Sequence, residues 1–134
     1  MLSLKPIELA FRRVLLGVLK LLFRRKRSLP SNIDFNSCTF LFLRQDLIGD
    51  ALISTPLLHS LKRKYPGAAL DVLMSPKNYF VLENDLVVRS RLVYRKSLPQ
   101  ALALLRTVRR NGYDFIVDLV DNQSTTSTLW CLFG

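Results

Sequence analysis

The stretch that decides the fold is Leu41-Phe-Leu-Arg-Gln-Asp-Leu-Ile-Gly-Asp-Ala-Leu-Ile-Ser-Thr-Pro-Leu-Leu-His-Ser-Leu-Lys62. An apolar run ends at Arg44, a short loop carries Asp46, Gly49 and Asp50, and a helical pattern follows. This order predicts a strand, a loop and a helix with a carboxylate at the bend. Ligands of parallel α/β sheets bind in the crevice at the carboxyl ends of the strands, so we expect Asp50 where a substrate can reach it.

Strand and helix patterns alternate from Thr39 onward. Strands are predicted over 39–44, 69–74 and 114–119 and within 87–94, and helices from the loop to about Tyr65, over 76–84 and 97–111, and from Ser124 onward. The alternation predicts a Rossmann-like α/β fold with a parallel sheet and right-handed crossovers. The helix over 97–111 is expected to bury Leu98, Leu102, Leu105 and Val108 and to point Arg106, Arg109 and Arg110 outward. The chain stops inside an apolar helical pattern, so residues 39–134 are expected to form an incomplete domain.

Most of the positive charge lies in an N-terminal arm. Residues 1–27 hold eight Lys or Arg against the single Glu8, a net charge of +7, whereas residues 28–134 have a net charge of +3. Residues 4–24 separate into an apolar and a cationic face on a helical wheel, which predicts an amphipathic helix in front of the sheet. Residues 28–38, rich in Ser, Asn and Asp, are predicted to be a linker.

The arm has two interpretations. The first is a helix at an anionic membrane surface, with contacts from Arg12, Arg13, Lys20, Arg24, Arg25, Lys26 and Arg27. The second is a helix that packs its apolar stripe on the protein's own body or on a second copy. The repeated cations argue against a spanning helix and a signal peptide. No nucleic acid partner is expected, because the basic run lacks interleaved aromatic residues.

Several kinds of site are not indicated. The loop has neither the GxGxxG nor the P-loop spacing, no Ser lies in a GxSxG elbow, and no His or Cys accompanies its carboxylates, so we expect no metal ion. Cys38 and Cys131 show no metal or disulfide spacing. We therefore expect a reducing compartment and a small buried role for Cys38. His59 is expected at a surface or packing position without a partner.

The pattern alone leaves Asp50 open between chemistry and structure. As an N-cap it would accept hydrogen bonds from the first amides of the helix, worth about 1 kcal/mol. Thr55 and Pro56 offer a rival helix start, with Pro56 at the first helical position. The structural interpretation of Gly49 is a backbone position that requires positive φ.

The wider motif resembles the opening of the family 9 glycosyltransferases, the ADP-heptose:lipopolysaccharide heptosyltransferases. Their pattern is an apolar strand, Arg-x-Asp-x-x-Gly-Asp, an apolar stretch, Thr-Pro-x-Leu, and Leu-Lys-x-x-Tyr-Pro at the helix end. This sequence matches it from Arg44 through Thr55 and Pro56 to Pro66. The likeness continues through Ala69-Leu-Asp-Val-Leu and Tyr113-Asp-Phe-Ile-Val-Asp-Leu, and covers roughly residues 39–134.

The resemblance implies a GT-B fold, in which two Rossmann-like domains face each other across a cleft. This chain would supply the N-terminal, acceptor-side half of an inverting enzyme that needs no metal or cofactor. Asp50 matches the carboxylate taken to be the general base. The same cleft would be lined by Arg44, Asp46, Gly49, Asn122 and Gln123.

The implied reaction is heptosyl transfer from ADP-heptose to lipopolysaccharide core or a related lipid-linked glycan. It would take place at the cytoplasmic face of the inner membrane, with the protein bound peripherally. ADP-heptose would bind a C-terminal domain that this chain lacks, so we expect the chain alone to be inactive. Two alternatives stay open: a truncated, non-catalytic membrane-associated interaction module, and another nucleotide-sugar transferase of GT-B type.

Overall fold

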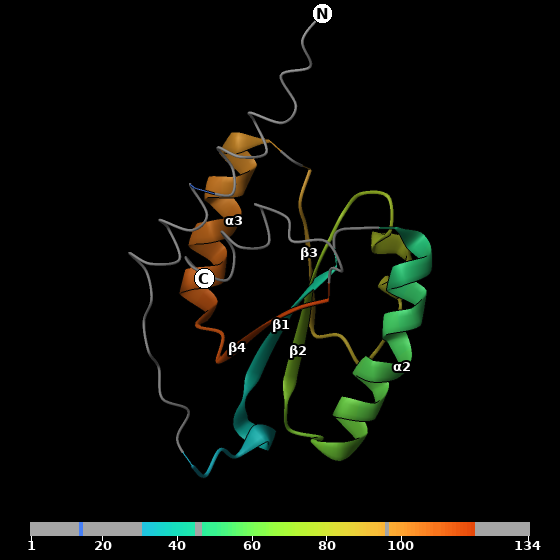
Figure 1. Ribbon diagram of the computed structural model, residues 1–134, viewed down its shortest axis with the longest axis vertical. Coiled ribbons are helices and arrows are strands. Elements are labelled where there is room, and N and C mark those ends of the chain that lie inside the picture. The colour runs from blue at the N-terminus through green and yellow to red at the C-terminus, as the bar shows by residue number, and fades with distance from the viewer. Residues whose placement is uncertain (1–13, 15–30, 45–46, 96, 120–134) are drawn as a thin grey trace, which may run out of the picture.

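A four-stranded parallel sheet forms the centre of the protein (Figure 1). The computed structural model describes residues 14, 31–44, 47–95 and 97–119. The strands are β1 (Thr39–Arg44), β2 (Ala69–Met74), β3 (Ser90–Val93) and β4 (Phe115–Asp118), in the order β3-β2-β1-β4. All three pairings are parallel. The Rossmann-like α/β architecture is therefore confirmed, and β1 and β2 have the predicted bounds.

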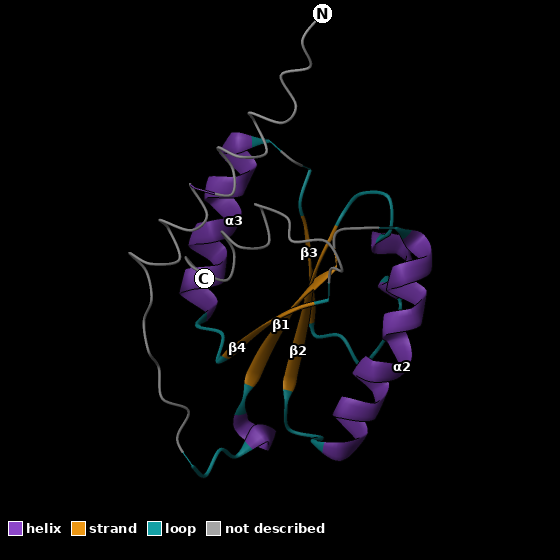
Figure 2. Cartoon of the chain, in the orientation of Figure 1, coloured by secondary structure: helices purple, strands orange, loops and turns teal. Residues whose placement is uncertain are grey.

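Two helices cover opposite faces of this sheet (Figure 2). They are α2 (Ile48–Lys64) and α3 (Leu98–Asn111). Successive strand residues point to opposite faces, so a strand covered on both sides must be apolar throughout. On the α2 side β1 buries Phe40 and Phe42, and on the α3 side it buries Leu41 and Leu43. The apolar run that predicted β1 is continuous because each face of this strand packs into a separate core cluster.

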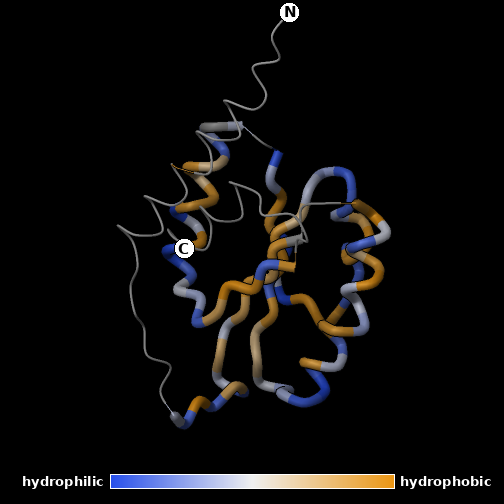
Figure 3. Tube along the Cα trace, in the orientation of Figure 1, coloured by the Kyte–Doolittle hydropathy of each residue, from blue (hydrophilic) through white to orange (hydrophobic). Residues whose placement is uncertain are grey.

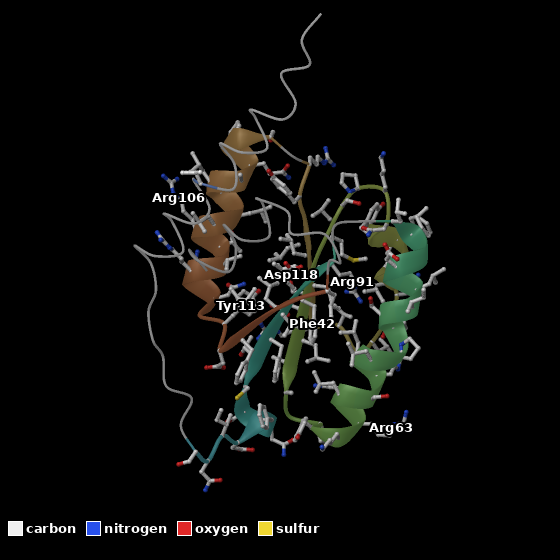
Figure 4. The ribbon with its side chains drawn as sticks, viewed as in Figure 1. Phe42, Arg63, Arg91, Arg106, Tyr113 and Asp118 are labelled. Atoms are coloured by element: carbon white, nitrogen blue, oxygen red, sulfur yellow. The ribbon has the colours of Figure 1, made fainter. Side chains whose placement is uncertain are left out.

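The end of α3 is set by Gly112. Its φ of 60° is left-handed, a conformation that costs glycine little, and its N–H bonds the Val108 carbonyl at 3.3 Å. The predicted buried face is wrong in one respect, because Leu102 is 61% exposed. The described side chains of α3 that pack on the sheet are Leu104, Leu105 and Val108. Arg106 points away from the body of the protein, as expected (Figure 4).

The folded domain begins before Thr39, inside the predicted linker. Ile33 and Phe35 pack against the core. Asp34 caps the 3-10 helix η1 (Phe35–Ser37) by accepting from the Asn36 amide at 3.1 Å. The arm over 1–27, apart from residue 14, and the linker residues 28–30 lie outside the described residues, as does the helix predicted from Ser124.

The short helix predicted over 76–84 is only a 3-10 turn, η2 (Tyr79–Leu82). The buried side chain of Asn78 explains this. Its Oδ1 accepts from the Ser75 amide at 2.9 Å and from the Ser75 hydroxyl at 3.1 Å. Such local side-chain bonds offer the backbone an alternative to the helical pattern.

An ion pair with a buried carboxylate stabilises the amino-terminal half of the sheet on the α3 side. Asp71 of β2 is fully buried. Arg89 donates to both of its oxygens, from Nε at 2.9 Å and from Nη2 at 2.6 Å. The Tyr113 hydroxyl, which lies between α3 and the sheet (Figure 4), donates to Oδ2 at 2.6 Å. Three segments that are distant in sequence therefore meet at one carboxylate.

The Tyr113 bond predicts a dependence of stability on alkaline pH. Burial, and next the bond to Asp71, raise the pKa of Tyr113 to about 12. A raised folded-state pKa means that the stabilisation is complete below the ordinary value of about 10 and is lost as the pH rises towards 12. Tyr113→Phe should lower the free energy of unfolding by about 1.5–3 kcal/mol at neutral pH. Urea unfolding should show this difference shrinking between pH ~10 and ~12, and a constant difference would contradict the assignment.

Candidate functional site

The candidate site lies at the carboxyl edge of the sheet, between β1 and β4. Chain order runs outward from β1 through β2 to β3 on one side, and β4 adds to the other side after α3. The reversal makes this the topological switch point, where open α/β sheets bind their ligands. Leu43 pairs with Asp118, and the Leu119 amide donates to the Leu43 carbonyl at 3.3 Å. The chain that leads to Asp50 in α2 therefore leaves β1 beside the end of β4.

Asp50 belongs to the first turn of α2 and does not cap it. Leu47 occupies the N-cap position without a side-chain capping bond, and the helix starts at Ile48. The proposed cap at Asp50 and the rival start at Thr55 and Pro56 are both wrong. Asp50 is partly exposed and lies in the first turn of α2, at the positive end of the helix dipole.

Packing against the sheet explains why α2 continues through Pro56. Proline removes one helical hydrogen bond, which normally ends or bends a helix. Here Ala51, Ser54 and Leu58 are buried against the sheet on both sides of the proline. The hydroxyl of Ser54 also bonds the Asp50 carbonyl at 2.7 Å. This contact fixes the backbone of the turn that carries Asp50.

Gly49 has no need of positive φ, because it adopts helical geometry. A Cβ added at Gly49 would meet no described atom within 4 Å. Neither backbone conformation nor packing within the described part of the chain therefore requires glycine here. A ligand can approach a backbone closely where no side chain fills the space, and Gly49 leaves such a space beside Asp50.

This space makes Gly49→Ala an informative change. It should raise the free energy of unfolding by up to about 1 kcal/mol, because alanine loses less conformational entropy in a helix. It should also weaken acceptor binding, because the methyl group occupies the open space. Chemical denaturation and calorimetric titration measure the two effects, with Ser60→Ala, exposed on the same helix, as the matched control. Unchanged affinity would show that no ligand approaches Gly49.

The structure corrects the expectation for His59. Its Nε2 lies 2.8 Å from Oδ2 of Asp85, and its side chain is about half exposed. Burial opposes ionisation of Asp85, but the Val87 amide, His59 and Arg91 together hold the pKa of this carboxyl below its ordinary value. His59 thus connects α2 to the segment after η2, a structural role away from the carboxyl edge.

The edge contains one acidic residue that sequence reasoning missed. Asp118 ends β4, and its side chain is exposed. The available signal was its position as the last polar residue of the predicted strand over 114–119.

At the end of β3, Gln100 holds the loop by accepting from the Arg95 amide at 3.0 Å and donating to the Val93 carbonyl at 3.2 Å.

The other predicted site residues are placed only in part. The backbone of Arg44 ends β1 at the switch point. Asp46, Asn122 and Gln123 lie outside the described residues, so their contacts with the acceptor stay predictions. Within the described ranges, no three His, Cys, Asp or Glu side chains are grouped as metal ligands. The helices of that same part include none with the length and apolar character needed to cross a membrane.

Known proteins similar to this chain support the resemblance. No family model matches the sequence. Lipopolysaccharide heptosyltransferase 3 of Escherichia coli K12 is 30% identical over 91 residues, covering 63% of this chain and 26% of that protein. A second E. coli protein of the same name is 31% identical over 80 residues, covering 54% and 24%. The chain thus spans about a quarter of the length of these curated relatives.

The fold is also found in a solved structure. A glycosyl transferase family 9 protein from Veillonella parvula DSM 2008 superposes with a TM-score of 0.66 at 20% identity. The match covers 79% of this chain and 32% of that protein. The chain is therefore similar in sequence to lipopolysaccharide heptosyltransferases and shares its fold with a glycosyltransferase family 9 protein, in each case over part of the length of those proteins.

Proposed function

We propose that this chain is the acceptor-side part of an inverting glycosyltransferase and that Asp50 is its general base. The observation that carries the proposal is the position of Asp50, partly exposed on the first turn of α2 at the switch point of the sheet. A sugar hydroxyl is a poor nucleophile, and a positioned base that removes its proton contributes typically 10²–10⁴-fold. The E. coli relatives support heptose and lipopolysaccharide as the substrate class.

In the proposed reaction, the carboxylate of Asp50 takes the proton of the acceptor hydroxyl. The hydroxyl oxygen then attacks the anomeric carbon from the face opposite the leaving group. The bond between that carbon and the diphosphate oxygen breaks, which inverts the anomeric configuration and releases the nucleoside diphosphate. Arg44, Asp46, Gly49, Asn122 and Gln123 would hold the acceptor, and a C-terminal GT-B domain would hold ADP-heptose without a metal or cofactor.

The proposal is tested by transfer from ADP-heptose to a purified lipopolysaccharide core acceptor, with a donor-binding half present. Formation of the inverted glycoside supports it. Transfer from another nucleotide sugar alone would favour a different GT-B transferase. Binding of acceptor without any transfer would favour a non-catalytic interaction module.

The basic arm would hold the protein peripherally at the cytoplasmic face of the inner membrane. Replacing the four consecutive cations at 24–27 by Gln should weaken binding to anionic vesicles by about two to three orders of magnitude, since each cation near such a surface contributes roughly 1 kcal/mol. Vesicle sedimentation measures this loss. Replacing Arg106, Arg109 and Arg110 of α3 by Gln is the control. Equal losses in both variants would remove the specific role of the arm.

A further inference from the structure

The outward face of α2 exposes large apolar side chains beside the candidate site. Leu52, Ile53 and Leu57 are 57%, 76% and 48% exposed. The tube in Figure 3 is hydrophobic along stretches of the first three turns of α2 and hydrophilic in its last turn. Phe80 of η2, an element in contact with α2, is 51% exposed. Contiguous exposed apolar side chains of this kind usually mark an interaction surface.

The first half of α2 departs from the usual amphipathic arrangement. An ordinary surface helix buries its large apolar residues and exposes polar ones. The residues that α2 buries against the sheet are the small Ala51 and Ser54 together with Leu58, whereas three large apolar residues of the same turns, Leu52, Ile53 and Leu57, point outward. Packing among the described residues therefore does not explain the apolar face, and a partner with apolar chemistry does.

Charge around the face selects the kind of partner. Arg63 and Lys64 follow the apolar turns on the exposed side, with Arg63 pointing outward at the far end of α2 (Figure 4), and Lys77 is exposed just before η2. The acidic side chains nearby in sequence are Asp50 in the first turn of α2 and Glu83 directly after η2. These cations favour an anionic surface, and the net charge of +3 over residues 28–134 opposes a second copy. Apolar and aromatic side chains bordered by cations are typical of structures that lie in a lipid headgroup layer.

We propose that the outward face of α2, together with η2, docks on an anionic lipid surface. This contact is distinct from that of the N-terminal arm, because it belongs to the folded domain and fixes its orientation. Ile53 is one turn from Asp50, a rise of about 4.5 Å along the helix. Docking would therefore hold the carboxyl edge of the sheet at headgroup depth. The inference does not depend on Asp50 being a base, because lipid contact is measured without transfer.

The test places an environment-sensitive fluorophore on the face of the full chain. Ile53→Cys is labelled in a Cys131→Ser background, since Cys38 is buried. Leu102→Cys, an exposed leucine on α3, is the matched control. With vesicles of phosphatidylglycerol and phosphatidylcholine, the label at 53 should shift to shorter wavelength and the label at 102 should not. Arg63→Gln should weaken the response about fivefold, and Arg110→Gln, in the last turn of α3, should leave it unchanged.

The possible results of this experiment distinguish a lipid partner of the α2 face from other partners. No shift at position 53 while the chain sediments with vesicles would mean that the arm alone contacts lipid, and would overturn the proposal. Equal shifts at 53 and 102 would show unspecific adsorption and overturn it as well. A shift at 53 that appears without vesicles and grows with protein concentration would assign the face to a second copy instead.

Discussion

Asp50→Asn should lower the rate of glycosyl transfer by about 10²–10⁴-fold while leaving acceptor affinity within a few-fold of wild type. The amide keeps the size of the carboxylate but cannot accept the proton of the acceptor hydroxyl. The rate is to be measured under single-turnover conditions in the full-length enzyme that the proposed function requires. Acceptor affinity is measured separately by calorimetry.

The structure predicts that this substitution is tolerated by the fold. Asp50 makes no N-cap, so the start of the helix does not depend on its side chain, and the favourable charge that Asn lacks at the helix start is worth about 0.3–1 kcal/mol. Glu83→Gln is the matched control, because it also removes one carboxylate, at an exposed position directly after η2. It should leave the rate of transfer unchanged. Near-normal turnover in the Asp50 variant would reduce Asp50 to a structural role at the helix start.

Arg89→Leu should lower the free energy of unfolding by about 3–5 kcal/mol. The substitution leaves the carboxylate of Asp71 fully buried, with the Tyr113 hydroxyl as its remaining partner in the network. A buried charge without its counter-ion costs far more than an exposed one. The half-exposed side chain of Arg89 allows some water to reach the pair, so we expect the lower end of this range.

Urea unfolding of the Arg89 variant measures this loss. Arg106→Leu, on the outward side of α3, is the matched control and should change stability by no more than about 0.5 kcal/mol. A small loss in the Arg89 variant would show that water replaces the guanidinium at Asp71. In that case the pair of Asp71 and Arg89 would contribute no more to the free energy of unfolding than a surface ion pair does, although its carboxylate is completely buried.

The elements that the sequence predicted best are those whose signals are local. The apolar run over 39–44 corresponds to β1 because both faces of that strand are buried. Asn111-Gly112 marks the end of α3 because glycine adopts the left-handed conformation at little cost. The place of Asp50 at the carboxyl edge also follows from the order of strand, loop and helix alone.

The features that sequence reasoning missed depend on residues distant in the chain. The start of α2 at Ile48 has no side-chain cap to mark it, and burial of Ala51 and Leu58 carries the helix through Pro56. The partner of His59 lies 26 positions away. Asp71 likewise contacts residues that are distant in the chain, Arg89 and Tyr113. A helical wheel for α3 placed Leu105 and Val108 correctly but also assigned Leu102 to the buried face, because only the sheet determines which leucines are covered.

The most direct test of the central claim is acceptor titration into the isotope-labelled 134-residue chain, followed by amide NMR shifts. The claim is that the acceptor binds at the carboxyl edge between β1 and β4. We expect shifts concentrated at residues 47–50 and 118–119, with little change at the amino-terminal edge near Ala69 and Asp114. Saturable shifts confined to that opposite edge, or none at 47–50, would contradict the account.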